Sequence, residues 1–290
     1  MSIFVTGASG FIGNHYIQHL RDCDIEHEVL NEKFPFSSDL QLSKGATVVH
    51  LAGMAHGKAR SEEDFFLVNR DYPLLLAQLA KSQGVRRFIY LSSINVYDFE
   101  QSQPFKEETI TAPSTAYEQS KLEAERGLLK LKAEDFQVVI LRCPLVYGEG
   151  APANFSRLMS LSLRSPILPF GSTVAQRSYL SVGNLCSAIN TCIESTSVLH
   201  SEVYNLTDSY DLGIGQVTSM IRSAFGLKTL QLPIPETAMN FVAKIVGAER
   251  VSNSLLGSLC VSCASFINTY RWSPAETPKV GFSKLRNNND

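Results

Sequence analysis

The chain has 290 residues, which is enough for one large α/β domain or for a large and a small one. Its 44% hydrophobic and 19% charged residues are typical of a soluble globular protein. A formal charge of −2 with no stripe of Lys and Arg argues against a nucleic-acid partner. Because the sequence shows neither a signal-peptide pattern nor a stretch of roughly twenty apolar residues, we expect a cytoplasmic protein with no membrane partner. The six cysteines are scattered, and no His or Cys spacing indicates a metal site.

The N-terminus predicts a dinucleotide site. A β-branched and aromatic run, residues 2–5, leads into three glycines, Gly7, Gly10 and Gly13, and then into an apolar helix start. In a strand, turn, helix unit the first glycine allows the turn, the second lets a pyrophosphate approach the backbone, and the third lets the helix lie close to its strand. The phosphates would then lie at the helix N-terminus, where unpaired N–H groups and the macrodipole favour negative charge.

Helices and strands alternate in the pattern of the following residues. We expect Pro73 to kink or restart a long helix and Ser114 to cap the next one. The expected helices are 11–20, 63–83 and 115–132, and the expected strands are 27–30, 47–52, 87–93 and 137–142. This alternation predicts an α/β fold with a doubly wound (Rossmann) parallel sheet.

The sheet is expected to be abbreviated around its third strand. Only residues 31–46 separate the expected strands 27–30 and 47–52, and they are too few for a helix, a strand and a second helix. Asp39 and Leu40 would be what remains of a short strand. Asn31 takes the position at which an acidic residue usually binds the ribose 2′-hydroxyl of NAD, so the choice between NAD and NADP stays open.

Proline and glycine become frequent after Gly150, and we take this change in composition as the boundary between two parts of the chain. Residues 1–150 are expected to form the dinucleotide-binding domain, and residues 151–290 mainly a smaller substrate-binding lobe over the carboxyl ends of the strands. Strands near 178–182 and 203–206 are expected to rejoin the main sheet.

Three polar side chains form a candidate catalytic set. Tyr117 and Lys121 lie four residues apart on one expected helix and share a face, and Ser93 ends a strand at the same edge of the sheet. A tyrosine that exchanges a proton near pH 7 needs a pKa about two to three units below its usual value of about 10. A nearby ammonium and an oxidised nicotinamide ring would together lower it, and Ser93 would hold the substrate oxygen in line.

With these residues the sequence resembles the extended short-chain dehydrogenase/reductase family, in its nucleotide-sugar epimerase/dehydratase branch, over nearly the whole chain. The matching motifs are 6–13, 49–53, Asn69, 91–97, 117–121, 142–148, 153–155, 177–182, 255–259 and 270–274. The last two resemble most closely a bacterial subgroup that makes deoxy and amino sugars for surface polysaccharide. Asp98 departs from the family pattern, in which a glycine usually follows the Val-Tyr pair.

The resemblance implies NAD or NADP as cofactor, a nucleotide-sugar substrate and a homodimer. The implied cofactor contacts are Gly7, Ser9, Gly10, Phe11, Ile12, Asn31, Asp39, Leu40, Leu51, Ala52, Gly53, Asn69, Tyr117, Lys121 and Pro144. The implied substrate contacts are Ser93, Asn95, Asn154, Phe155 and Arg177. The guanidinium fork of Arg177 would fit a diphosphate.

Three functions remain open at this point. The first is a UDP-hexose 4-epimerase that transfers hydride at C4 through a 4-keto intermediate. The second is an NAD(P)H-dependent reductase of a UDP-4-keto-6-deoxyhexose, and the third is a cofactor-sensing binding protein, which the presence of both Tyr117 and Lys121 disfavours. Dehydration is disfavoured as well, because related dehydratases place an acidic pair directly after the catalytic Ser or Thr, where this chain has Ile94 and Asn95.

Overall fold

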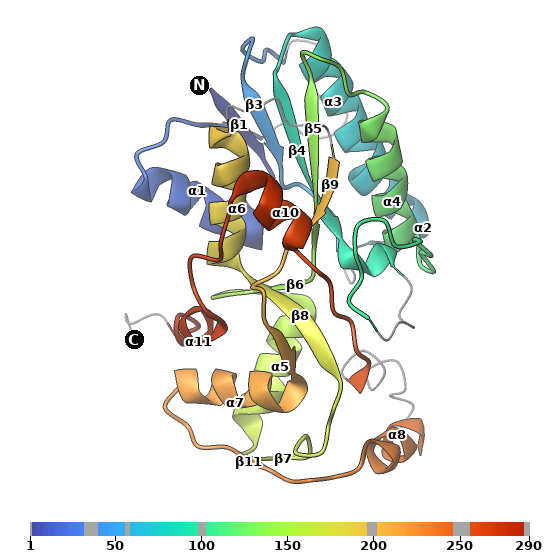
Figure 1. Ribbon diagram of the computed structural model, residues 1–290, viewed down its shortest axis with the longest axis vertical. Coiled ribbons are helices and arrows are strands. Elements are labelled where there is room, and N and C mark those ends of the chain that lie inside the picture. Colours follow the sequence, from blue (N-terminus) through green and yellow to red (C-terminus); the bar gives the residue numbers. More distant parts are fainter. Residues whose placement is uncertain are drawn as a thin grey trace.

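The computed structural model describes residues 2–31, 40–55, 59–97, 103–195, 202–245 and 256–286. Figure 1 shows two parts, a sheet with helices on both faces and a smaller lobe below it. In the described part of the chain, no helix has both the length and the apolar character needed to cross a bilayer. Within the same residues, no three His, Cys, Asp or Glu side chains gather as metal ligands would.

A six-stranded parallel sheet forms the larger part, in the order β2-β1-β3-β4-β5-β9. Its strands are β1 (Ile3–Thr6), β2 (Glu28–Leu30), β3 (Thr47–His50), β4 (Arg87–Ser93), β5 (Gln137–Cys143) and β9 (Glu202–Asn205). Each strand is parallel to its neighbours, which confirms the doubly wound sheet expected from the sequence.

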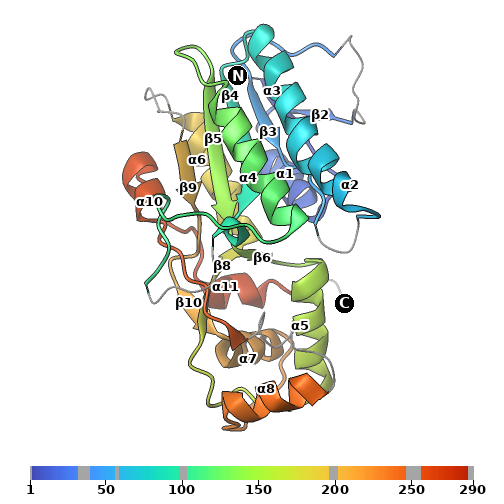
Figure 2. The ribbon, with the colours of Figure 1, turned by 90° about the vertical axis from the view of Figure 1, so that its right-hand side faces the viewer.

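Helices cover both faces of this sheet because its side chains alternate. In β1, Ile3 and Val5 pack into one apolar cluster and Phe4 into the other. The first cluster includes residues of α1 (Phe11–Asp22), α6 (Val182–Glu194) and α10 (Ala264–Tyr270), and the second includes residues of α3 (Tyr72–Ser82) and α4 (Ala116–Leu129). Figure 2 shows α3 and α4 side by side on their face of the sheet.

In the crossover from β3 to β4, residues 62–82 form one continuous helical stretch. α2 (Glu62–Phe66) continues into a π-helical segment, η1 (Leu67–Asp71), and then into α3. Pro73 is the second residue of α3 and donates no hydrogen bond to the preceding π-helical turn, in which the carbonyl oxygen of Asn69 accepts a 2.7 Å hydrogen bond from Tyr90 Oη. The restart expected at this proline agrees with the change from π-helical to α-helical geometry at Tyr72.

The cap of α4 differs from the expected one. The hydroxyl of Thr115 accepts a hydrogen bond from the Glu118 N–H, and the Glu118 carboxylate accepts one from the Thr115 N–H. Ser114 also donates to Glu118, but it is not the N-cap. The capping box requires an acid three residues after the cap, and Glu118 stands at that distance from Thr115.

The connection between β2 and β3 is short, as expected. Its described residues, Asn31 and 40–46, contain no helix or strand, and Asp39 lies outside the described residues. Leu40 is therefore not part of a strand; its carbonyl oxygen accepts a 2.8 Å hydrogen bond from Gln83 Nε2.

The lobe contains two small sheets and four helices in the described residues. Its elements are β6 (Leu145–Tyr147), α5 (Ala153–Arg164), β7 (Ile167–Leu168), β8 (Gln176–Ser181), β10 (Asp211–Gly213), α7 (Ile214–Ala224), β11 (Leu230–Gln231), α8 (Glu236–Ile245) and α11 (Pro278–Ser283). The three-stranded sheet has the order β10-β8-β6, and β7 pairs with β11.

One of the two late strands does not rejoin the main sheet. β9 pairs with β5, which confirms the expectation for residues near 203–206. The expectation for 178–182 is wrong, because β8 pairs with β6 and β10, and Val182 already begins α6. Pro144 separates β5 from β6 and has no N–H to donate, so the ladder of the main sheet ends at Cys143 and a new ladder starts at Leu145.

Candidate active site

The turn between β1 and α1 has the geometry that a pyrophosphate needs. Gly7 has a φ of +70°, and a Cβ atom there would lie 2.4 Å from the main-chain nitrogen of Ala52. A Cβ atom at Gly13 would lie 2.1 Å from the carbonyl oxygen of Gly7, so only glycine lets α1 lie this close to the turn. Gly10 is the N-cap of α1, and neither a side-chain cap nor an acid occupies the first turn. The helix N-terminus therefore fits an anionic group.

The ends of β1 and β3 are joined by hydrogen bonds. Thr6 Oγ1 lies 3.0 Å from His50 Nδ1, and the Ala52 N–H donates to Thr6 Oγ1 over 3.3 Å. Burial, with the charge of Lys121, lowers the pKa of His50 to about 3, so the imidazole is neutral. These contacts hold the expected cofactor segment 51–53 against the glycine turn.

Asn69 lies in the π-helical segment η1 and is fully buried. Its Oδ1 accepts from the Met54 N–H at 2.8 Å, and its Nδ2 donates to the Met54 carbonyl oxygen at 3.0 Å. A Cβ atom at Gly53 would lie 3.4 Å from Asn69 Oδ1 and 3.5 Å from Lys121 Nζ. The structure thus brings these three predicted residues together, with Asn69 shaping the strand end.

Ser93 and Tyr117 meet at the carboxyl edge of the sheet. The Ser93 hydroxyl hydrogen-bonds the phenol of Tyr117, and it also accepts a 3.2 Å bond from the Asn95 N–H as the N-cap of the 3₁₀ turn η2 (Ile94–Val96). Phe65 packs edge-on against the Tyr117 ring, with 5.9 Å between centroids. Burial raises the pKa of Tyr117, and the bond to Ser93 opposes that rise. The predicted fall of this pKa remains a prediction for the cofactor-bound protein.

Lys121 lies one helical turn after Tyr117 and is buried. Its Nζ donates a 2.8 Å hydrogen bond to the carbonyl oxygen of Leu91 and lies 4.7 Å from the centroid of the Tyr90 ring. Burial lowers the pKa of Lys121 to about 8, while the negative charge of Glu125 opposes the fall. A buried ammonium that titrates near neutral pH is typical of functional sites.

The sequence analysis did not predict a buried hydrogen-bond network that lies next to Ser93, Tyr117 and Lys121. Glu125 accepts hydrogen bonds from Ser92 Oγ at 2.5 Å and from Arg142 Nη2 at 2.6 Å. Arg142 Nη1 donates to Tyr97 Oη at 2.7 Å, and Tyr97 in turn donates to Asn205. The available signal was spacing, because Glu125 lies four residues after Lys121 on the same helix face.

The predicted substrate residues are less closely gathered. Asn154 is exposed in the first turn of α5, and Asn95 is half-buried beside Ser93. Phe155 is fully buried against the rings of Tyr147 and Phe282 in the lobe core, so a substrate contact from Phe155 would use its main chain. Arg177 is half-buried, and its Nη1 donates 2.9 Å to the carbonyl oxygen of Gly257. These roles remain predictions.

The remaining predicted cofactor residues differ in exposure. Ser9 and Asn31 are exposed, Phe11, Ile12, Leu40, Leu51 and Ala52 are half-buried, and Pro144 is buried after β5. Asp39 lies outside the described residues. Their cofactor contacts remain predictions.

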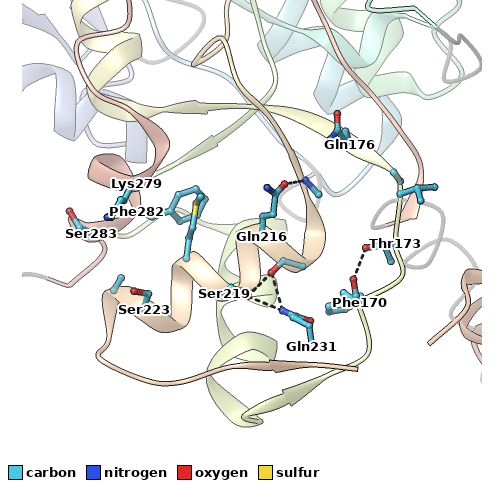
Figure 3. Close-up of a pocket in the computed structure, with 17 residues that line it drawn as sticks. Phe170, Thr173, Gln176, Gln216, Ser219, Ser223, Gln231, Lys279, Phe282 and Ser283 are labelled. Carbon is cyan, nitrogen blue, oxygen red and sulfur yellow. Dashed lines mark hydrogen bonds between the residues drawn. The ribbon is translucent and has the colours of Figure 1, made fainter. Parts of the chain in front are cut away.

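A separate cavity of about 950 Å³ lies in the lobe between α7, α11 and the segment 170–176 (Figure 3). Met220 and Phe282 form part of its wall, and Lys279 and Ser283 lie on its α11 side. No residue predicted for the catalytic, cofactor or substrate site is among the described residues that line it.

Comparison with known proteins agrees with this geometry. The sequence pattern of the NAD dependent epimerase/dehydratase family matches residues 3–207. The chain belongs to this family. As a member, it is an NAD(P)-dependent enzyme of the short-chain dehydrogenase/reductase type, which confirms the resemblance and the expected cofactor class.

Individual relatives within the family cover almost the whole chain. A UDP-glucose 4-epimerase of Vibrio cholerae is 32% identical over 98% of this chain and 94% of its own. RMD of Pseudomonas aeruginosa, solved with NADPH, has a TM-score of 0.75 at 22% identity, and a UDP-glucuronic acid 4-epimerase of Bacillus cereus, solved with NAD, has 0.75 at 19%. Each structure covers 98% of this chain and 97% of its own. At these identities the two structures show a shared fold.

Proposed function

We propose that the protein is an NAD(P)-dependent 4-epimerase of a nucleotide sugar, most simply a UDP-hexose. The observation that carries this proposal is the hydrogen bond between Ser93 and Tyr117 beside the buried ammonium of Lys121, at the sheet edge that also holds the glycine turn. The UDP-glucose 4-epimerase of Vibrio cholerae supports the reaction type.

Each of the three side chains has a separate task. A bound nicotinamide cofactor would supply the hydride acceptor and donor. Tyr117 would take the proton of the sugar 4-hydroxyl and later return it, while Ser93 would hold the same oxygen by a hydrogen bond. Lys121 would hold the cofactor ribose and favour the phenolate by its charge. The 4-keto sugar would turn between the two transfers, so that its opposite face is reduced.

The residues after Ser93 argue against dehydration. Ile94 is 3% exposed and Asn95 is neutral, so neither position supplies a carboxyl group for elimination. The only proton transfer that we propose is therefore the one at the 4-oxygen of the sugar.

One observation favours a second candidate, a reductase of a UDP-4-keto-6-deoxyhexose. The described residues between β2 and β3 hold no helix or strand, and Asn31 at the end of β2 is exposed. Fewer contacts on the adenosine side would favour exchange of the cofactor after each turnover, which a reductase requires.

One experiment separates the two reactions. Purified enzyme is incubated with UDP-glucose, UDP-N-acetylglucosamine and a UDP-4-keto-6-deoxyhexose, and nicotinamide absorbance and sugar products are followed together. An epimerase interconverts C4 epimers with no net change in absorbance. Stoichiometric oxidation of NAD(P)H with the keto sugar, with both UDP-hexoses unchanged, would show the reductase instead. Light scattering of the same sample tests the proposed homodimer.

A further inference from the structure

Exposed apolar side chains are concentrated at the far end of the lobe. Eleven large hydrophobic residues are exposed among the described residues, and five of them lie in 161–167 and 227–232. These five are Leu161 at 41% exposure, Ile167 at 50%, Leu227 at 43%, Leu230 at 56% and Leu232 at 38%. In Figure 1, β7 and β11 lie at the end of the lobe remote from the parallel sheet.

The pairing of β7 with β11 places several of these side chains on one open face. Ile167 and Leu230 are direct neighbours in the parallel register. Their successors, Leu168 and Gln231, face the lobe: Leu168 is buried, and Gln231 Nε2 donates to the Gly215 carbonyl oxygen of α7. Side chains alternate along a strand, so Ile167, Leu230 and Leu232 point away from α7.

Arg222 of α7 forms hydrogen bonds both to the loop that follows α7 and to the C-terminal end of α5. Its Nη1 donates to the carbonyl oxygens of Ser162 and Ser165 at 2.8 and 3.0 Å, and its Nε donates to that of Lys228 at 2.8 Å. Leu227 and Lys228 are thereby held near the C-terminal turn of α5, which carries Leu161.

The charge of this region is one-sided. Around the five apolar residues, segments 157–168 and 227–235 contain three Arg and Lys residues and no Asp or Glu, and the first acid after them is Glu236 at the start of α8. Arg157, Arg164 and Lys228 are exposed. Arg157 and Arg164 lie four residues before and three after Leu161, so the three share one face of α5.

We propose that this surface, formed by the five apolar residues with Arg157, Arg164 and Lys228 and called the lobe-tip surface, docks on an anionic lipid bilayer. Exposed apolar side chains insert at the boundary between headgroups and acyl chains, and flanking cations are attracted to anionic headgroups. Such a contact lies on the bilayer and needs no spanning helix; it differs from the sequence-based expectation of no membrane partner, and the experiment below decides between the two. The reactive edge of the parallel sheet would remain in water.

The test is flotation of purified full-length protein with phosphatidylcholine vesicles that contain about 30 mol% phosphatidylglycerol, at about 0.05 M and about 0.5 M salt. Wild type should float with these vesicles at low salt and much less at high salt. Ile167→Ser with Leu230→Ser should abolish flotation. Arg164→Gln with Lys228→Gln should weaken partitioning about 25-fold, because each cation near an anionic surface contributes about fivefold.

Matched controls change the same residue types elsewhere. Ile110→Ser removes an 84% exposed isoleucine, and Lys44→Gln with Lys132→Gln removes two exposed cations of the nucleotide-binding half. These variants should float as wild type does, and all variants should keep wild-type turnover of a water-soluble nucleotide sugar. Flotation itself requires no turnover, so failure of the proposed reaction would leave the flotation test intact.

Three outcomes would overturn the proposal. One is absence of flotation at low salt, and another is equal flotation of wild type and both lobe-tip variants. The third is a homo-oligomer that Ile167→Ser with Leu230→Ser converts to monomers without any lipid binding by wild type, which would make the surface an interface between copies of the chain.

Discussion

Lys121 reaches across from α4 to donate its hydrogen bond to the carbonyl oxygen of Leu91, two residues before Ser93. This contact joins the helix that carries Tyr117 to the strand that ends in Ser93. The relative position of the three side chains is therefore fixed by one buried ammonium as well as by the packing of α4 on β4.

Tyr117→Phe should lower kcat more than about hundredfold, because it removes the group that exchanges the proton. It removes little contact area, so cofactor affinity should change by no more than about threefold. Steady-state kinetics and cofactor titration measure the two effects. Retention of about a tenth or more of wild-type kcat would contradict the role of Tyr117.

Lys121→Met should alter the dependence of stability on pH. Because the pKa of Lys121 is about 8 in the folded chain and 10.5 for the free group, the unfolded chain binds more protons between these values. The cost of burying the charge is fully present below pH 8 and is relieved as the pH rises to about 10.5. Wild type should therefore gain about 2–3 kcal/mol relative to Lys121→Met across this window in urea unfolding. Parallel curves for the two proteins would show that Lys121 is not a buried cation.

Breaking the Glu125 and Arg142 pair should be costly, since both side chains are nearly inaccessible at 2% and 6% exposure. Glu125→Gln should lower the free energy of unfolding by about 3–5 kcal/mol, because it leaves a buried guanidinium without its counter-charge. The control is Glu123→Gln, which breaks the exposed 2.8 Å pair with Arg70 and should cost less than about 1 kcal/mol. Similar losses in the two variants would contradict this account.

Two glycine substitutions should separate folding from cofactor binding. Gly13→Ala places a Cβ atom 2.1 Å from the Gly7 carbonyl oxygen and should destabilise the fold by at least about 2 kcal/mol. At Gly10 the Cβ atom would lie 3.2 Å from the same oxygen and φ is −78°, so Gly10→Ala should fold nearly normally. It should nevertheless weaken NAD(P) binding at least about tenfold, because the methyl group stands where the pyrophosphate approaches. Thermal unfolding with and without cofactor would reveal either effect, and tight binding by Gly10→Ala would place the phosphates elsewhere.

The cofactor preference should be weak or should favour NADP. Asn31 carries no charge to repel a 2′-phosphate, and Lys33 lies two residues after it, beyond Glu32. Titration with NAD and with NADP would measure the ratio of dissociation constants. A preference of about a hundredfold for NAD would mean that another residue binds the ribose.

Local patterns in the sequence determined the nucleotide-binding half. The strand, Gly7-x-x-Gly10-x-x-Gly13 and helix signature depends on residues within one turn, and the spacing of Tyr117 and Lys121 places both on one helix face whatever surrounds them. The structure confirms the strand, the turn and both helices, and the family match confirms the cofactor class. The catalytic roles of Tyr117 and Lys121 remain predictions. The epimerase reaction remains a proposal because it depends on pocket shape, which no local pattern specifies.

Tertiary structure alone decided three features. β8 is not part of the main sheet. Pro144 ends the ladder of β5, and β6 after it pairs with β8, about thirty residues later in the sequence. The partnership of Glu125 with Arg142 depends on how α4 packs over β5, and the burial that lowers the pKa of Lys121 depends on the same packing. The lobe-tip surface joins segments about sixty residues apart through the carbonyl contacts of Arg222. Pairings between distant segments depend on how whole helices and strands pack, so the spacing of residues in the sequence does not predict them.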